Sequence, residues 1–311
     1  MTDTVVFAVG GNALAPGGGG GHEQQTERVR EVTGAAAAIL GGDHRLVLVH
    51  GNGPQVGALA LAQEAVAREV PPQPLFVLGA MTQGQLGYAL AQALGDELVS
   101  QGQQRRVAAV MTQVVVDADD PAFSNPTKPI GPFFPAGRAR RLAQARGWDV
   151  AEDSGRGWRR VVASPRPVEV VEEAQIRGLL EAGQVVVAAG GGGVPVVREG
   201  DRLVGVEAVI DKDFAAALLG QLIGASTLLL LTGVERVAID YGTPRERPLD
   251  EISIDEAEEH LAAGQFPAGS MGPKVQAAIQ FLRTGGRTAV ITSLERGADA
   301  LEGRAGTRIV A

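Results

Sequence analysis

The chain has 311 residues, of which 45% are hydrophobic and 21% are charged, and 28 basic residues stand against 36 acidic ones for a net charge of -8. This apolar content is enough for a packed core, so the composition excludes disordered and fibrous proteins. The acidic balance argues against nucleic acid as a partner, because a protein that binds phosphate backbones needs a basic face. The absence of cysteine excludes disulfides, thiolate metal sites and a thiol nucleophile.

Apolar segments alternate with helical patterns along most of the chain. Short, almost wholly apolar strands between helices are typical of a parallel sheet that is covered on both faces, so the sequence predicts an α/β fold. In chain order we expect a strand at 5–9, a helix at 23–40, a strand at 46–49, helices at 54–68 and 82–101, strands at 107–116 and 185–189, a helix at 214–223, a strand at 227–231, a helix at 272–283 and a strand at 288–292.

Two segments interrupt this alternation. Residues 117–166 are polar, rich in proline, glycine and arginine, and contain both tryptophans, so we expect them to leave the sheet as a lid or a small subdomain. Residues 194–206 have the pattern of a hairpin with a turn at 199–201. Five consecutive glycines at 17–21 predict a flexible loop that carries no chemistry of its own.

The distribution of apolar and basic residues also indicates the compartment in which the protein is found. No apolar segment reaches the ~18 residues that span a bilayer. The N-terminal segment has no basic residues of the kind that open a signal peptide. We therefore expect a cytoplasmic protein without a membrane partner.

Glycine clusters follow three of the predicted strands, and they are Gly10-Gly11-Asn12, Gly51-Asn52-Gly53 and the run at 190–193. Turns that follow parallel strands meet at the carboxyl edge of a sheet, where their backbone N–H groups can bind an anion. For each turn alone, an ordinary tight turn is the alternative. Three together point to an extended anionic ligand such as a nucleotide. The pattern is neither a P-loop nor the G-x-G-x-x-G of a dinucleotide site.

Lysine is scarce, since the 28 basic residues include only Lys128, Lys212 and Lys274. Where arginine is preferred so strongly, a remaining lysine is a candidate for a position that only a compact ammonium fits, such as one beside a phosphoryl oxygen. Lys212 and Lys274 also stand at predicted helix starts, where a cation opposes the helix dipole unless an anionic ligand is present. Asp211 and Asp213 flank Lys212 as caps or ion-pair partners, and Asp213 could position lysines from two sides. For each lysine, a solvated surface charge is the simpler alternative.

Histidine and metal chemistry leave weaker signals. His50 follows the second predicted strand and could act as a general base, although such a histidine more often donates to a backbone carbonyl. No histidine or carboxylate cluster has transition-metal spacing, so no metal ligands are assigned. Mg²⁺ held by phosphates and water leaves little trace in a sequence, so this pattern does not exclude it as a cofactor.

Several segments resemble carbamate kinase, a member of the amino acid kinase superfamily, in order and over nearly the whole chain. They are VVFAVGGNAL, HGNGPQVG, MTQGQLGY, TQVVVDADDPAFSNPTKPIGPF, GRGWRRVVASPRP, GGGGVPVV, GVEAVIDKDFA, LTGVERVAIDYGTP and GSMGPKVQAAIQF. NPTKPIGPF and VEAVIDKD distinguish carbamate kinase from the other members. The resemblance implies a three-layer αβα sandwich with an open, mainly parallel eight-stranded sheet. It also implies a carbamate and carbamoyl phosphate part at 1–223, with a protruding subdomain at 117–166, and a nucleotide-binding part at 224–311.

The resemblance further implies a homodimeric, Mg²⁺-dependent enzyme of arginine metabolism that interconverts ATP plus carbamate with ADP plus carbamoyl phosphate. Carried over by motif, the catalytic residues are Lys128, which reaches the carbamoyl phosphate from the subdomain, Lys212, Lys274 and Asp213, which organises the lysines. The implied phosphate- and substrate-binding residues are Gly10, Gly11, Asn12, Gly51, Asn52 and Gly53. The implied nucleotide-binding residues are Asp211, Lys212, Thr232, Gly233, Tyr241, Met271, Gly272 and Lys274.

The phosphoryl transfer that the resemblance implies agrees with the candidate residues of this chain. Carbamate is already an anion and needs no general base, so catalysis reduces to alignment and charge neutralisation, and His50 is not required. Three alternatives stay open: an acyl-phosphate-forming kinase for acetylglutamate, glutamate or aspartate, a nucleotide-binding regulator without catalysis and, more distantly, a Rossmann oxidoreductase.

Overall fold

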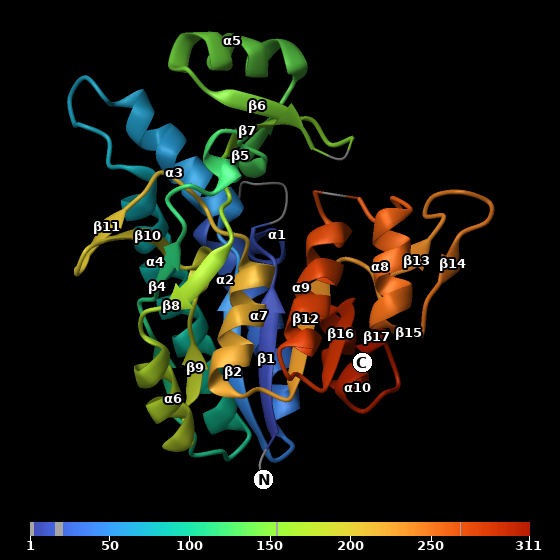
Figure 1. Cartoon of the computed structure of the whole chain (residues 1–311). Helices are drawn as coiled ribbons and strands as arrows, with labels where there is room; N and C mark the ends of the chain where they lie inside the picture. The colour runs from blue at the N-terminus through green and yellow to red at the C-terminus, as the bar shows by residue number, and fades with distance from the viewer. Residues whose placement is uncertain (1–2, 16–20, 154, 268) are drawn as a thin grey trace.

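In the computed structural model, which describes residues 3–15, 21–153, 155–267 and 269–311, an eight-stranded sheet runs through the centre of the molecule (Figure 1). Its order is β15-β17-β16-β12-β1-β2-β9-β3, and all neighbours are parallel except β16 and β17. This confirms the expected mainly parallel sheet. The predicted loop at 17–21 lies, apart from Gly21, outside the described residues. The strands are β1 (Asp3–Val9), β2 (His44–His50), β3 (Val107–Ala109), β9 (Val185–Val187), β12 (Thr227–Thr232), β15 (Glu251–Ser253), β16 (Thr288–Ser293) and β17 (Thr307–Val310).

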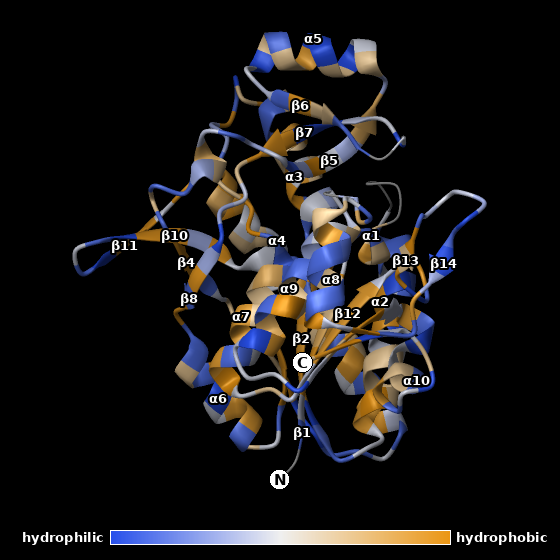
Figure 2. Cartoon of the chain, turned by 45° about the vertical axis from the view of Figure 1, so that its right-hand side comes forward, coloured by the Kyte–Doolittle hydropathy of each residue, from blue (hydrophilic) through white to orange (hydrophobic). Residues whose placement is uncertain are grey.

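Helices cover both faces of this sheet, as its apolar strands require. In β1, Val5 and Phe7 pack toward α2 and α4, whereas Val6 and Ala8 pack toward α7 and α9. Figure 2 shows the resulting hydrophobic interior on the strands of the central sheet. The expected three layers are therefore confirmed. One face carries α2 (His22–Leu40), α4 (Leu75–Ser100) and α10 (Gly297–Leu301), and the other carries α6 (Glu173–Glu181), α7 (Lys212–Ile223), α8 (Ile254–Ala262) and α9 (Met271–Arg283).

Two predicted elements have different bounds. The single strand expected at 107–116 is wrong, because the chain divides into β3 in the central sheet and β4 (Gln113–Val116) in a second sheet. Thr112 fixes the turn between them, since its backbone N–H and C=O both bond the side-chain amide of Gln83. Helix α4 begins at Leu75 rather than at 82, and the Leu75 N–H donates to the Glu207 carboxylate at 2.8 Å. Both differences depend on partners far away in the sequence.

The hairpin expected at 194–206 is confirmed, and it extends into a four-stranded sheet of order β11-β10-β4-β8 beside the central one. The other strands of the four-stranded sheet are β10 (Val194–Glu199), β11 (Arg202–Gly205) and β8 (Pro167–Val170). Outside it, α1 (Gly11–Leu14) follows β1, and β13 (Ala238–Ile239) pairs with β14 (Arg247–Pro248) in a two-stranded sheet. The short elements β8, β13, β14 and α1 were not predicted, because segments of two to four residues are too short to show a strand or helix periodicity in hydrophobicity. Within the described ranges, no helix is long and apolar enough to cross a membrane.

The segment 117–166 forms a subdomain rather than a simple lid, and it projects beyond the carboxyl ends of the central strands (Figure 1). Its antiparallel sheet has the order β5-β7-β6. Arg146 and Arg160 both lie over the ring of Trp148, at 5.1 and 5.2 Å, and both bond Glu64 of α3, at 2.8 and 3.1 Å. These contacts anchor the subdomain on α3. The elements are β5 (Lys128–Phe134), α5 (Ala136–Arg146), β6 (Asp149–Glu152), β7 (Trp158–Val162) and the supporting α3 (Gly53–Ala65).

The backbones of α3 and β5 touch at Gly57, where a Cβ would lie 2.0 Å from the backbone N of Gly131. We expect Gly57→Ala to lower the free energy of unfolding by more than about 2 kcal/mol, because the two backbones must separate. Gly79→Ala in α4 is the matched control, since a Cβ there meets nothing within 4 Å. Helix propensity should make that variant more stable, by about 0.5–1 kcal/mol. Denaturant unfolding measures both, and a neutral Gly57→Ala would contradict the close approach.

Candidate active site

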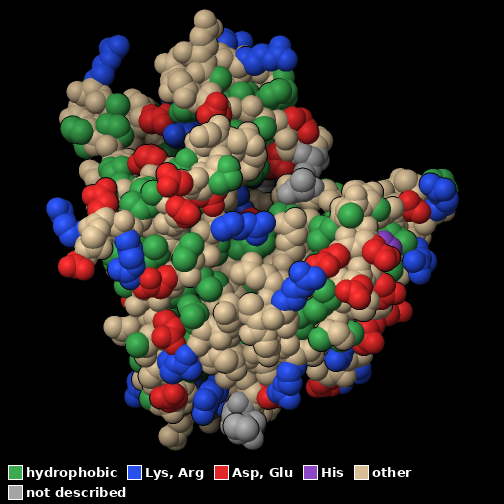
Figure 3. Space-filling view, in the orientation of Figure 1, with side chains coloured by type: hydrophobic (Ala, Val, Ile, Leu, Met, Phe, Trp, Pro, Cys, Tyr) green, Lys and Arg blue, Asp and Glu red, His purple; other side chains and the backbone are tan. Residues whose placement is uncertain are grey.

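A cavity of about 580 Å³ opens at the carboxyl edge of the central sheet, beneath the subdomain. The loops after β1, β2 and β12 form its floor, and residues of β5 and β7 form its upper wall. Figure 3 shows basic and acidic side chains interspersed over one face of the molecule rather than a single basic patch. The predicted site residues that line the cavity are Gly10, Gly11, Asn12, Gly51, Asn52, Gly53, Lys128, Asp211, Lys212, Asp213, Thr232, Gly233 and Lys274.

The first two glycine turns touch each other through their backbones. The Gly51 N–H donates to the carbonyl of Val9 at 2.8 Å. A Cβ on Gly51 would lie 2.6 Å from the backbone N of Gly11 and 3.3 Å from Cδ of Lys212. A side chain is therefore excluded here, and the two turns form one continuous surface with the start of α7. Both turns meet at one edge of the sheet, as their positions after parallel strands predicted.

The third turn is explained mainly by packing. Of its glycines only Gly191 lines the cavity. Its φ is +67°, and a Cβ on it would lie 2.2 Å from Nδ2 of Asn52, so the Asn52 side chain packs directly on this turn. Asn52 also donates to the hydroxyl of Thr82 at 2.9 Å. The turn thus holds Asn52 in place and contributes little surface of its own to a ligand.

His50 is buried beside the third turn and does not line this cavity. Burial lowers the pKa of His50 to about 4, although its bond to the Gly51 carbonyl raises it in part. The ring is therefore neutral at neutral pH, and Nδ1 lies 3.1 Å from the Gly51 carbonyl oxygen, to which it donates. The simpler of the two alternatives, donation to a backbone carbonyl, describes this histidine.

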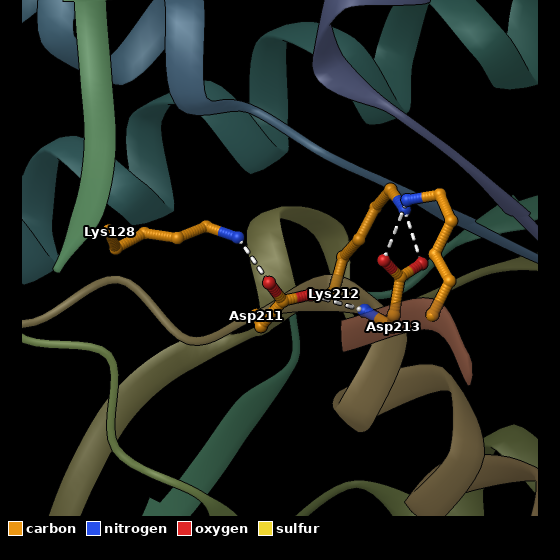
Figure 4. Close-up of polar contacts among 5 residues, drawn as sticks. Lys128, Asp211, Lys212 and Asp213 are labelled. Atoms are coloured by element: carbon orange, nitrogen blue, oxygen red, sulfur yellow. Dashed lines mark hydrogen bonds and ion pairs between the residues drawn. The ribbon is translucent and has the colours of Figure 1, made fainter. Parts of the chain in front are cut away.

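Three lysines converge on two aspartates at the start of α7 (Figure 4). Asp213 accepts hydrogen bonds from Lys212 Nζ at 2.5 Å and, on its other oxygen, from Lys274 Nζ at 2.9 Å. Asp211 accepts from Lys128 Nζ at 2.5 Å, and its second oxygen caps α7 through the Asp213 N–H at 2.9 Å. The cluster therefore joins β5 of the subdomain, α7 and α9 at one point.

Burial sets the charges of this cluster. The side chain of Lys212 is 9% exposed and that of Asp213 is 4% exposed. Burial lowers the pKa of Lys212 to about 8, although Asp213 raises it. Burial favours the neutral form of Asp213, but Lys212 and Lys274 hold its pKa well below the usual range. For Lys274, burial lowers the pKa and Asp213 and Asp211 outweigh this, so it lies above its ordinary value. Three cations thus face two carboxylates, which leaves positive charge for an anionic ligand.

The upper wall brings in charged residues that the sequence analysis did not single out. Asp153 accepts from Arg159 at 3.0 Å and from Arg156 at 2.9 Å, and all three line the cavity. Both arginines lie in the GRGWRRVV segment that carried part of the resemblance. The general preference for arginine concealed them as single residues. Further lining residues from other elements are Arg28, Glu31, Ser270, Leu294 and Glu295.

Three of the residues expected to bind the nucleotide lie outside the walls of this cavity. Tyr241 is 62% exposed, in the loop between β13 and β14. Met271 and Gly272 open α9 within one turn of Lys274, and the Gly272 N–H donates to the carbonyl of Pro267 at 2.9 Å. Their contact with a nucleotide remains a prediction.

The arrangement defines a class of site. Backbone N–H groups at two glycine turns, a helix start and three clustered lysines can hold and neutralise a phosphoryl group in transfer. The model of the amino acid kinase family matches residues 3–293. The chain belongs to the amino acid kinase family.

Within that family the chain groups with the carbamate kinases. It is 51% identical to the carbamate kinase of Thermococcus kodakarensis over 98% of each chain, and 47% identical to that of Pyrococcus furiosus over 100% of each. The solved carbamate kinase from Giardia lamblia bound to AMP-PNP superposes with a TM-score of 0.89 at 42% identity, and covers 99% of this chain and 98% of that one. N-acetylglutamate synthase from Neisseria gonorrhoeae, at 17% identity and a TM-score of 0.59, shares the fold alone.

Proposed function

We propose that this protein catalyses reversible phosphoryl transfer between ATP and carbamate, with ADP and carbamoyl phosphate as the other pair. The observation that carries the proposal is the pair of lysines, Lys212 and Lys274, held on one carboxylate at the edge of two glycine turns. The similarity to carbamate kinases over the whole chain supports the choice of carbamate as acceptor.

The reaction needs alignment and charge neutralisation. A carbamate oxygen attacks the γ-phosphorus, the bond from this phosphorus to the bridging oxygen of ATP breaks, and ADP keeps the electron pair. No proton has to move, because carbamate arrives as an anion. Asp213 holds Lys212 and Lys274 against the transferred group. The N–H group of Gly11 binds one of its oxygens, and Lys128 neutralises the carbamoyl phosphate end.

Mg²⁺ belongs to the same proposal as a partner of the nucleotide. The described residues hold no group of three or more histidine and carboxylate side chains that could cage a metal ion. Both oxygens of Asp213 already accept from lysines. The ion would therefore be held by phosphate oxygens and water, and it would withdraw charge from the phosphates.

The decisive experiment is ATP formation from ADP, Mg²⁺ and carbamoyl phosphate, with acetyl phosphate as a parallel donor. We expect turnover on carbamoyl phosphate that is lost in Lys128→Ala. Phosphorylation of acetylglutamate, glutamate or aspartate, with no turnover on carbamoyl phosphate, would contradict the proposal. Nucleotide binding without any turnover would favour a regulator instead.

The depressed pKa of Lys212 predicts an alkaline limit to nucleotide binding. Lys212 is charged below about pH 8 and loses its proton above it. The affinity for ADP should therefore fall as the pH rises above this value, by up to about tenfold per pH unit. Calorimetric titration at pH 7 and pH 9 measures this. A Lys212→Met variant should bind more weakly with little change over this range, whereas equal pH dependence in both proteins would assign the titration to another group.

We also propose the division of labour and the assembly that the resemblance implies. Residues 1–223 bind carbamate or carbamoyl phosphate, and 224–311 bind the nucleotide, in a cytoplasmic enzyme of arginine metabolism. A homodimer is supported by the exposed apolar side chains Met81 and Tyr88 of α4 and by β3 at the edge of the sheet. Light scattering should then give twice the chain mass of 32.1 kDa. A mass of one chain would contradict the dimer.

A further inference from the structure

Two connectors join the subdomain to the rest of the protein, and Arg166 lies in the second of them. The first connector leads from β4 to β5, and the second leads from β7 to β8. Pro165 and Pro167 flank Arg166 and are both buried, and a residue before a proline is restricted to extended conformations. The Arg166 N–H donates to Oδ2 of Asp120, in the first connector, at 2.8 Å. The two connectors are thus tied together at Arg166.

The side chain of Arg166 contacts two helices of the central fold. Its Cζ lies 3.4 Å from the centroid of the Phe214 ring, and its Nη2 donates to Oε1 of Gln276 at 3.1 Å. Phe214 directly follows Asp213 in α7. Gln276 lies two residues beyond Lys274 in α9. One guanidinium therefore joins a connector of the subdomain to both helices that carry the lysines of the phosphoryl site.

Arg166 also lies in the field of the lysine cluster. Burial lowers the pKa of the Arg166 guanidinium, and the carboxylates of Asp211 and Asp120 oppose this effect. Asp211 is the carboxylate that accepts from Lys128 Nζ at 2.5 Å (Figure 4). Lys128 stands where the first connector ends, and Arg166 stands in the second. Each connector therefore brings a cation toward Asp211.

The position of Arg166 indicates an indirect role. Within the described part of the chain, the residues that line the cavity include neither Arg166 nor its partners Phe214 and Gln276. A ligand in the cavity is held by other side chains, so an effect of Arg166 on the reaction must pass through the elements that it joins.

We propose that Arg166 is a positioning residue that keeps the subdomain, and with it Lys128, aligned with α7 and α9. Phosphoryl transfer is sensitive to displacements of about 1 Å, and the three lysines start on separate elements. Arg166 favours the arrangement in which Lys128 neutralises the acceptor end while Lys212 and Lys274 hold the transferred group. This inference rests on the proposed function for the identity of the two ends.

The test is Arg166→Ala in the full chain. We expect kcat for ATP formation to fall about 10-fold, because one cation–π contact and one hydrogen bond together shift a conformational equilibrium by about this factor. The affinities for ADP and for carbamoyl phosphate, each measured alone by calorimetry, should change less than kcat does. Wild-type kcat overturns the proposal. A loss of affinity for carbamoyl phosphate as large as the loss of kcat also overturns it, since Arg166 would then act on binding.

Gln276→Ala removes only the link to α9. Gln276 is exposed, so this variant keeps the fold and decides the matter if Arg166→Ala does not fold. It should lower kcat less than Arg166→Ala does, and the double variant should be no slower than Arg166→Ala alone, because both changes break the same link. Losses of kcat that add in the double variant, or wild-type kcat in Gln276→Ala, overturn the link.

Arg138→Ala is the matched control. Arg138 is also exposed and also lies over an aromatic ring, that of Phe134 at 5.1 Å. It belongs to α5, which lies at the end of the subdomain away from α7 and α9 (Figure 1). This variant should keep wild-type kcat, and a fall equal to that in Arg166→Ala overturns the specific role of Arg166. Thermal unfolding of all the variants shows whether a fall in kcat merely follows a loss of folded protein, which would overturn the proposal too.

The wild type separates this test from the test of the proposed function. Turnover on carbamoyl phosphate that Arg166→Ala leaves unchanged refutes the positioning role alone. Turnover on another acyl phosphate, with none on carbamoyl phosphate, refutes the proposed function, and the same variants are then compared on that donor. A wild type without turnover on any donor overturns both.

Discussion

Replacing Asp213 by asparagine is expected to lower kcat for ATP formation by about 10²–10³-fold, the range found when one preorganised electrostatic group is removed from an active site. Each oxygen of Asp213 accepts from a different lysine, at 2.5 Å from Lys212 and at 2.9 Å from Lys274. An asparagine has one acceptor oxygen, and its NH₂ group would face the second ammonium. One lysine must therefore move away from the position at which it neutralises the phosphoryl group.

The same change should alter the pH dependence in a defined direction. Asp213 raises the pKa of Lys212 against the effect of burial, so without this carboxylate the pKa falls below about 8. The alkaline limit of activity should consequently move to lower pH in Asp213→Asn. A merely structural role for Asp213 would lower activity at every pH alike and leave the limit where it is.

A surface aspartate in an ion pair provides the control for this variant. Asp250 is paired with Arg236 at 2.7 Å, but its side chain is 84% exposed, so Asp250→Asn should leave kcat and the pH profile unchanged. Thermal unfolding of both variants separates a loss of fold from a loss of catalysis. Wild-type kcat in Asp213→Asn would show that the two lysines do not need their shared carboxylate.

The central sheet could be predicted from the sequence because each of its strands, and each helix between them, shows a hydrophobic pattern within its own residues. Strands such as β1 and β12 are short apolar runs, and the helices between them repeat their apolar residues at helical spacing. The departure of residues 117–166 from the sheet could be predicted from their polar composition, but the strands and the helix inside this segment could not, because the segment is held by pairs distant in sequence, such as Arg160 with Glu64. The break between β3 and β4 depends on the contact of Thr112 with Gln83, which a continuous apolar pattern at 107–116 conceals.

The candidate site likewise contains residues that could be predicted from the sequence and residues that could not. The lysines could be singled out because only three of 28 basic residues are lysine, and because Lys212 and Lys274 stand at helix starts. Arg159 could not, since it is one of 25 arginines, the remainder after three lysines are subtracted from 28. Its place on the cavity wall exists only once β7, Asp153 and Gly131 are folded around it.

The scarcity of lysine leads to a second prediction with a large expected effect on kcat. Lys212→Arg is expected to lower kcat by about 100-fold or more, although the charge is kept, because a reacting group displaced by about 1 Å costs this much. The Lys212 side chain passes between the two glycine turns, where Cβ atoms built on Gly51 and Gly10 would lie 3.3 Å from its Cδ and 3.9 Å from its Cε. A planar guanidinium is wider than an ammonium and cannot reach Asp213 along this path without moving a turn.

Lys128→Arg provides the contrast. The Lys128 side chain is 26% exposed against 9% for Lys212, and it reaches the cavity from the projecting subdomain, so a guanidinium has room there. We therefore expect Lys128→Arg to keep more of its kcat than Lys212→Arg, with melting temperatures measured for both to separate folding from catalysis. Because both variants conserve charge, their difference reports the shape of the site alone. Near-wild-type kcat in Lys212→Arg would contradict this prediction. It would mean that lysine stands at these three positions for reasons unrelated to the size of the phosphoryl-binding site.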